Sequence, residues 1–136
     1  AMHSFGCRII QRLLEHCTAD MLKPVLKKIL SNVEKLAQDQ YGNYVVQHVL
    51  EHGALEDKKY IIQEVQKNVL VLAKHKSSSN VVEKCFDVLT ISDQAPLLKQ
   101  ERDALYDTVL GQAGDQSAPI FEMMVDDFGN YIVQKM

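Results

Sequence analysis

A repeat with a fixed period is the feature of this sequence that most constrains its fold. The segment SFGCRIIQRLLEHC at residues 4–17 aligns with QYGNYVVQHVLEHG at residues 40–53, and Gly6 and Gly42 lie 36 positions apart. The same offset relates LA at 36–37 to LA at 72–73, and VV at 45–46 to VV at 81–82. A last copy, DFGNYIVQKM, lies at residues 127–136, two periods and 15 further residues after the copy at residues 40–53. A period of this length predicts a solenoid, because one unit cannot bury its apolar face without neighbours.

Within each copy the apolar residues recur at helical spacing and leave one face polar, as at Ile9, Ile10, Leu13, Leu14 and at Val45, Val46, Val49, Leu50. Further amphipathic stretches lie at residues 21–30, behind the candidate cap Asp20, and at 32–38, 58–66, 68–73 and 97–110. No alternating pattern of strand residues is present. We therefore predict an all-α fold with about three helices per repeat. The insertion falls at 91–115, where Pro96, Gly111 and Gly114 predict a lengthened helix and a surface loop.

Composition narrows the class of protein. The chain has 136 residues, a formal net charge of −3 and three cysteines without CxxC spacing. Its apolar runs are too short to span a bilayer, and the cysteine pattern favours reduced thiols, so we expect a soluble intracellular chain. An acidic balance argues against binding that depends on phosphate contacts alone. If the chain binds a nucleic acid, the affinity must come largely from bases.

Polar pairs recur at one phase of the repeat. Residues four apart on a helix differ by about 40° around its axis and share a face. The pairs on the polar face are Cys7 with Gln11, Asn43 with Gln47, Ser79 with Glu83, and Asn130 with Gln134. The residue after each first member has a planar or amide group that could lie between adjacent bases: Arg8, Tyr44, Asn80 and Tyr131. Surface positions without a shared role have no reason to recur as pairs. This pattern therefore predicts a row of side chains that binds single-stranded RNA and recognises its bases.

The motifs GCRIIQ, GNYVVQ, SNVVE and GNYIVQ resemble the reading helices of Pumilio-type (PUF) repeats, and most closely the fifth to eighth repeats of animal Pumilio proteins. The resemblance implies a right-handed, armadillo/HEAT-like α-solenoid of three-helix repeats whose concave face binds RNA antiparallel, with the C-terminal repeat on the 5′ base. Residues 1–136 would form a partial Pumilio homology domain, cut at both ends. Its repeats would be about 1–30 (partial), 31–66, 67–114 with an insertion at about 91–115, and 115–136 (partial).

The side chains suggest a base for each pair. Glu83 offers only acceptors, and guanine is the base whose Watson–Crick edge offers two adjacent donors. Pairs of Asn with Gln suit uracil, although amide chemistry alone does not exclude other bases. Cys7 leaves room for a purine and Gln11 can pair with the edge of adenine, which the family pattern also gives. The predicted site is 5′-UGUA-3′.

Function follows from this resemblance. It implies repression or decay of messenger RNA through 3′ untranslated regions, by recruited protein effectors, in the cytoplasm. We expect no DNA or membrane partner, no cofactor or metal, and no catalysis, because the sequence has no phosphate-binding loop, nucleophile elbow or zinc-ligand spacing. The alternative is an armadillo- or HEAT-like protein-interaction scaffold, which would not require variable polar pairs at a fixed phase.

Other recurring positions have weaker interpretations. A basic column follows the second reading residues, and it either contacts the RNA backbone or forms a solvated edge: Arg12, His48, Lys84 and Lys135. The remaining histidines recur as His3 with His75 and as His16 with His52, and we expect them to be architectural residues near helix ends. Ser77 stands where the other copies have Phe5, Tyr41 or Phe128, which predicts looser packing at the start of that helix.

Overall fold

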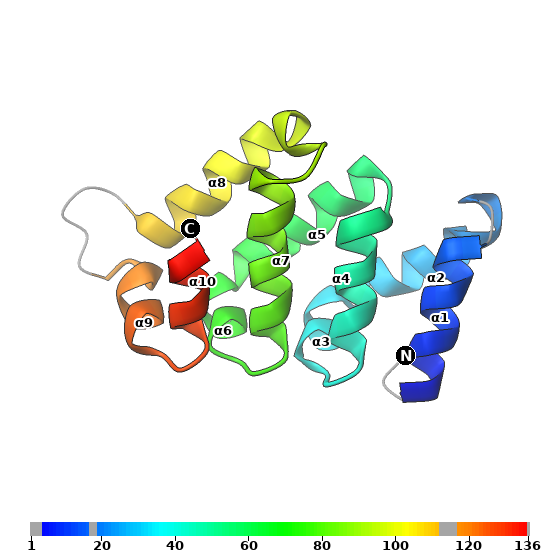
Figure 1. Ribbon diagram of the computed structural model, residues 1–136, viewed down its shortest axis with the longest axis horizontal. Coiled ribbons are helices and arrows are strands. Elements are labelled where there is room, and N and C mark those ends of the chain that lie inside the picture. Colours follow the sequence, from blue (N-terminus) through cyan, green and yellow to red (C-terminus); the bar gives the residue numbers. More distant parts are fainter. Residues whose placement is uncertain (1–3, 17–18, 112–116, 136) are drawn as a thin grey trace.

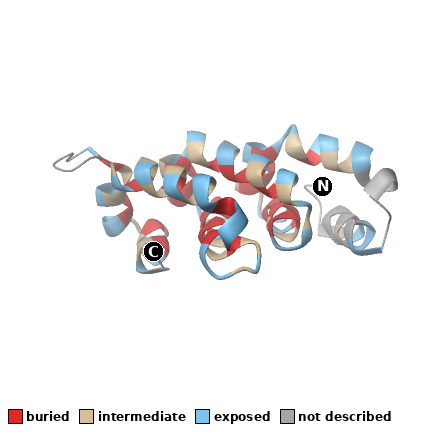
Figure 2. Ribbon diagram, turned by 90° about the horizontal axis from the view of Figure 1, so that it is seen from above, coloured by how far each residue is buried: buried red, intermediate tan, exposed pale blue. Residues whose placement is uncertain are grey.

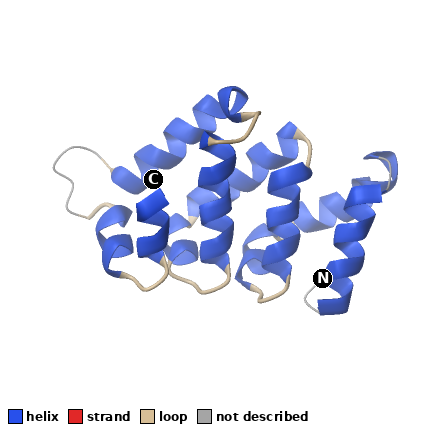
Figure 3. Ribbon diagram, in the orientation of Figure 1, coloured by secondary structure: helices blue, strands red, loops and turns tan. Residues whose placement is uncertain are grey.

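The computed structural model describes residues 4–16, 19–111 and 117–135, and for residues 4–7, 10, 14, 19–22 and 135 it describes the backbone alone. Every element in these ranges is a helix (Figure 3). They are α1 (Ser4–His16), α2 (Ala19–Leu30), α3 (Val33–Gln38), α4 (Gly42–His52), α5 (Leu55–Lys67), α6 (Val69–Ala73), α7 (Ser78–Thr90), the 3-10 helix η1 (Ala95–Leu98), α8 (Lys99–Leu110), α9 (Pro119–Val125) and α10 (Gly129–Lys135). None of the helices described is long and apolar enough to cross a membrane.

The helices form three rows that run along the molecule (Figure 1). One row is α1, α4, α7 and α10, in which each helix packs against the next. The second row is α2, α5 and α8, and the short helices α3, α6 and α9 form the third. Each repeat therefore takes one helix from each row, as in α3–α4–α5 and α6–α7–α8. The predicted all-α solenoid of three-helix repeats is confirmed.

The core lies where the rows meet, and buried residues line the inner faces of the helices (Figure 2). The predicted apolar stripe of α4 is buried, and its counterparts in α7 are Val81, Val82, Cys85 and Phe86. Phe86 meets the edge of the Tyr106 ring of α8, with ring centroids 5.2 Å apart. Ile9 and Leu13 on α1 are exposed. At the other end of the row, Ile132 on α10 is buried.

The insertion differs from its prediction. Helix α8 itself has 12 residues and its counterpart α5 has 13, and the helical stretch is lengthened instead by η1, which runs directly into α8. The extra residues lie in the links on either side of α8. Pro96 stands in the first turn of η1, and Gly111 ends α8 with a φ of 69°, a left-handed conformation that suits glycine. Part of the second link lies outside the described residues.

Two helix starts also differ. The expected cap Asp20 lies inside α2, which begins at Ala19, so it does not precede the helix. Helix α5 begins at Leu55 rather than at residue 58, and its first turn contains Glu56 and Asp57. Carboxylates in the first turn interact favourably with the helix dipole, and this explains the earlier start.

Candidate nucleic-acid interface

The four predicted pairs lie on the four helices of one row (Figure 1). Because α4 packs between α1 and α7, and α7 also packs against α10, the pairs follow one another in chain order along the molecule. Gln11, Gln47 and Glu83 are half-buried and Gln134 is exposed. The side chain of Cys7 lies outside the described residues. The row is thus a series of polar positions on neighbouring parallel helices.

On α4 the two members of the pair form one hydrogen-bonded unit. Asn43 is buried, and its Nδ2 group donates to the backbone carbonyls of Asp39 at 2.9 Å and Gln40 at 3.0 Å. Its Oδ1 accepts a hydrogen bond of 2.9 Å from Nε2 of Gln47. Both N–H bonds of Asn43 are therefore used within the protein. The Gln47 carboxamide still has an oxygen acceptor and a second N–H beyond its bond to Asn43.

The same unit recurs on α10. Asn130 donates through Nδ2 to the carbonyls of Asp126 at 2.6 Å and Asp127 at 3.0 Å, and its Oδ1 accepts from Gln134 at 3.2 Å. Two repeats far apart in sequence thus hold a glutamine in the same way. In these two pairs the asparagine positions the glutamine, a role that spacing alone did not indicate.

On α7 the pair is different in kind. The buried Ser79 donates through Oγ to the carbonyl of Lys76 at 3.1 Å. A serine is smaller than an asparagine, and the half-buried Glu83 is a carboxylate where the neighbouring repeats have an amide. This position therefore presents acceptors only.

The residues predicted to stack are all exposed. Tyr44 and Tyr131 have more than half of their surface open to solvent although both are large aromatic residues. Arg8 and Asn80 are exposed at the same phase. Neither tyrosine is a core residue, so each ring is free to lie against a flat partner.

A tight turn precedes each of the helices α4, α7 and α10. Asp39 accepts through Oδ2 from the backbone N–H of Tyr41 at 2.9 Å and of Gly42 at 2.6 Å. A Cβ on Gly42 would lie 2.8 Å from the carbonyl oxygen of Leu36, so only glycine fits this approach. Asp126 makes the equivalent bonds before α10, to Phe128 and Gly129. Sequence reasoning missed these aspartates, although the recurring D-x-aromatic-G pattern was available as a signal.

The turn before α7 uses a histidine instead. His75 accepts through Nδ1 from the backbone N–H of Ser77 at 3.1 Å, which confirms its architectural role. Ser78 stands where the other repeats have glycine, and its Oγ donates to the carbonyl of Leu72 at 2.7 Å. Ser77 is half-buried within this turn, and the looser packing expected there stays a prediction.

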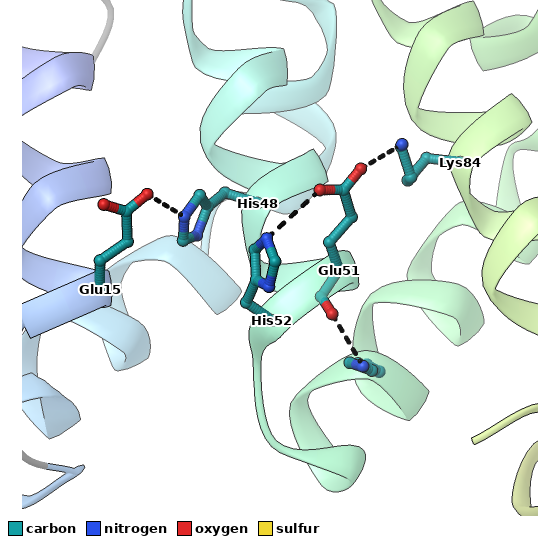
Figure 4. Close-up of polar contacts among 6 residues, drawn as sticks. Glu15, His48, Glu51, His52 and Lys84 are labelled. Atoms are coloured by element: carbon teal, nitrogen blue, oxygen red, sulfur yellow. Dashed lines mark hydrogen bonds and ion pairs between the residues drawn. The ribbon is translucent and has the colours of Figure 1, made fainter. Parts of the chain in front are cut away.

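Two members of the basic column are paired with carboxylates of the preceding repeat (Figure 4). His48 Nε2 lies 3.2 Å from Glu15 Oε1, and Lys84 donates to Glu51 Oε1. The hydrogen bond from Lys84 lowers the pKa of the Glu51 carboxyl. Arg12 is exposed, and the side chain of Lys135 lies outside the described residues. The two glutamates were not predicted, although they follow Gln11 and Gln47 by one helical turn.

No group of three or more histidine, cysteine or acidic side chains in the described ranges is arranged to hold a metal ion. Cys85 is fully buried, and burial raises the pKa of its thiol well above the ordinary value. This thiol stays protonated and packs as an apolar residue.

Comparison with known sequences decides the family. A family model described as the Pumilio-family RNA binding repeat matches residues 1–30, 32–66, 68–100 and 119–136. The chain belongs to the Pumilio family. Each matched range contains one of the four polar pairs, and the unmatched stretch 101–118 overlaps the insertion. No curated protein sequence matches significantly.

Solved structures of Pumilio-family proteins share the fold. The chain is 38% identical to PUF-8, solved in complex with PBE-RNA, with a TM-score of 0.83 over 98% of this chain and 36% of that one. It is 35% identical to the Puf3 RNA binding domain bound to the Cox17 RNA 3′ UTR recognition sequence site B, with a TM-score of 0.82 over 98% and 39% of the two chains. The RNA-binding domain of yeast Puf5p bound to SMX2 RNA shows the same fold at 24% identity and a TM-score of 0.77, over 99% and 36%. The chain therefore spans less than half the length of these Pumilio-family structures.

Proposed function

We propose that this chain binds single-stranded RNA in a sequence-specific manner along the row α1, α4, α7 and α10, with one base per repeat. The observation that carries the proposal is the recurrence of the same Asn–Gln unit on α4 and α10, each beside an exposed tyrosine. The family membership and the RNA-bound structures of PUF-8 and Puf3 support it.

The proposed recognition sequence is 5′-UGUA-3′, bound antiparallel to the chain. Gln134 and Gln47 each present an oxygen and an N–H, which match the N3–H and a carbonyl of uracil. Glu83 accepts from the two donors of guanine. Gln11 beside Cys7 takes adenine.

Stacking supplies the second component of binding. Packed helices lie roughly 8–10 Å apart, which is farther than bases stack in a relaxed strand. The RNA must be extended, with Arg8, Tyr44, Asn80 and Tyr131 placed between successive bases. Base–aromatic stacking contributes about 1–3 kcal/mol per base, so Tyr44 and Tyr131 together give roughly 2–6 kcal/mol before the strand is ordered, to which Arg8, Asn80 and the base-edge hydrogen bonds add. Micromolar binding needs about 8 kcal/mol.

A fluorescence anisotropy titration tests this function directly. The protein is titrated into two labelled RNAs of equal length and composition, one with a central UGUA and one with the same bases scrambled. We expect weak binding to the first, in the micromolar range, and at least tenfold weaker binding to the second. Equal affinities for the two RNAs would contradict base reading and favour a protein-interaction scaffold.

For the whole protein we propose regulation of messenger RNA in the cytoplasm through 3′ untranslated regions, with repression or decay by recruited protein effectors. The 3′ UTR sequence bound by Puf3 supports this proposal. We propose no catalytic step. A reporter with UGUA sites in its 3′ untranslated region should be repressed by the full-length protein, and a reporter with scrambled sites should not.

A further inference from the structure

A column of acidic residues runs beside the reading pairs. Glu15 and Glu51 follow Gln11 and Gln47 by four positions, and Asp87 follows Glu83 in the same way. Residues four apart lie on one side of a helix. The acidic column therefore borders the path proposed for the RNA, one helical turn beyond the base-reading residues.

Two junctions between repeats use this column in the same way (Figure 4). Glu15 on α1 pairs with His48 on α4 at 3.2 Å, and Glu51 on α4 pairs with Lys84 on α7. In each pair the acid of one repeat binds the basic residue of the next. The other carboxylate oxygen of Glu51 lies 3.5 Å from His52 on its own helix. The contact between an acidic residue and a basic residue of the next repeat thus occurs at two junctions and is not a single surface ion pair.

The acidic and basic side chains of these pairs differ in how far they are exposed to solvent. The side chains of His48 and Lys84 are 13% and 24% exposed, whereas those of Glu15 and Glu51 are 51% and 42% exposed. Each basic group is thus less exposed than the carboxylate paired with it. A phosphate at this edge meets a negative charge first, and to reach Lys84 it must displace Glu51 and leave that carboxylate unpaired beside the RNA backbone.

From this arrangement we propose that Glu51, with Glu15 in the preceding repeat, is a specificity-determining residue that withholds the basic column from RNA phosphates and thereby suppresses sequence-independent binding. The inference rests on the proposed function. It assigns the net negative charge a role, since binding that is poor in phosphate contacts depends on the bases.

Salt dependence of RNA binding measures the proposed effect. Each phosphate contact to single-stranded nucleic acid steepens the slope of log K against log salt by about 0.7. We compare wild type, Glu51→Gln, Lys84→Met and the double variant between about 50 and 200 mM salt, where one added contact increases the change in affinity about 2.6-fold. Glu56→Gln on α5 is the matched control, because it removes the same charge from an exposed site in another row.

Glu51→Gln should bind both UGUA and scrambled RNA more tightly at low salt and show the steeper slope, while Glu56→Gln should match wild type. Lys84→Met should leave the slope of wild type unchanged and should abolish the gain in the Glu51→Gln background. The inference is overturned if Glu51→Gln behaves like Glu56→Gln, or if Lys84→Met alone flattens the slope of wild type.

Failure of the proposed function and failure of the inference can be told apart. The preference of wild type for UGUA over scrambled RNA tests the proposed function alone, and the slope difference between Glu51→Gln and Glu56→Gln tests the inference alone. Thermal melts of every variant show whether it is folded. A slope change in a variant that is fully folded at the temperature of the binding assay supports the proposal, and a slope change found only in a variant that is partly unfolded at that temperature overturns it in favour of a structural role.

Discussion

Exchanging the α7 pair for the α4 pair, Ser79→Asn with Glu83→Gln, should change the second base of the preferred RNA from G to U. The receiving site already has the necessary acceptors. Ser79 lies within hydrogen-bond distance of the Lys76 carbonyl, and its own N–H donates to the carbonyl of His75. These carbonyls stand 36 positions after those of Asp39 and Gln40, which hold Asn43 on α4. The new asparagine can therefore be held in the same way and can orient the new glutamine.

The magnitude follows from the hydrogen bonds. In the parent, uracil opposite Glu83 places a carbonyl oxygen against a carboxylate and leaves a charged acceptor unpaired, which costs about 1–3 kcal/mol. The double variant removes that penalty for uracil. It weakens the binding of guanine, because the two donors of guanine then face one amide in place of a carboxylate. Since 1.4 kcal/mol is a factor of ten, the parent should bind UGUA roughly 5- to 150-fold more tightly than UUUA. The double variant should prefer UUUA by a comparable ratio.

Four titrations test this reasoning: parent and double variant, each against UGUA and UUUA RNAs with flanks of equal length. The two single variants show how much of the switch depends on the Asn–Gln hydrogen bond, because Glu83→Gln alone lacks the partner that orients the glutamine. Val81, Val82 and Phe86 are unchanged, so the melting temperature should barely move. A folded double variant that still prefers UGUA would refute base reading by this pair.

Three further results are expected. Gly42→Ala should lower the stability by about 1–3 kcal/mol, because its Cβ would lie 2.8 Å from the carbonyl oxygen of Leu36; a lower urea midpoint with an unchanged slope would show this, and an unchanged midpoint would contradict the close approach. Phe86→Ala should lower the stability by about 3–5 kcal/mol, since the ring is buried against Tyr106; a loss below about 1 kcal/mol in the same urea assay would show that the cavity collapses. The pKa of Glu51 is lowered by Lys84, so the stability from this pair is present above the ordinary value of 4.5 and is lost as the pH falls through the lowered pKa. Because the pair is partly exposed, we expect under about 1 kcal/mol, and thermal melts of wild type and Glu51→Gln between pH 3 and 7 should converge at the acid end.

The fold class and the repeat phase of the candidate site could be predicted from the order of the amino acids. A fixed period of 36 residues and an apolar stripe at helical spacing are properties of the sequence alone, so they predict stacked three-helix repeats without tertiary contacts. The stripe of α4 and its counterpart in α7 are buried as predicted. Helical geometry also determined that Asn43 and Gln47 share a face with each other, because residues four apart always do.

How the side chains of the candidate site act on one another depends on contacts that form in the folded chain. The spacing gave Asn43 and Gln47 equal status, but the turn at Asp39 and Gln40 brings two carbonyls to the asparagine and makes it the residue that positions the glutamine. The position of the insertion was likewise predictable, but its form depended on where Gly111 ended α8.

The basic column shows most clearly that contacts between repeats could not be predicted from the sequence. The repeat phase places His48 and Lys84 directly after Gln47 and Glu83. This position was compatible both with contacts to RNA phosphates and with a solvated edge. The structure gives both a carboxylate partner from the preceding repeat. Which side chains meet between repeats depends on the distance and rotation between packed helices, and these are set by the whole core and not by the residues of either helix alone.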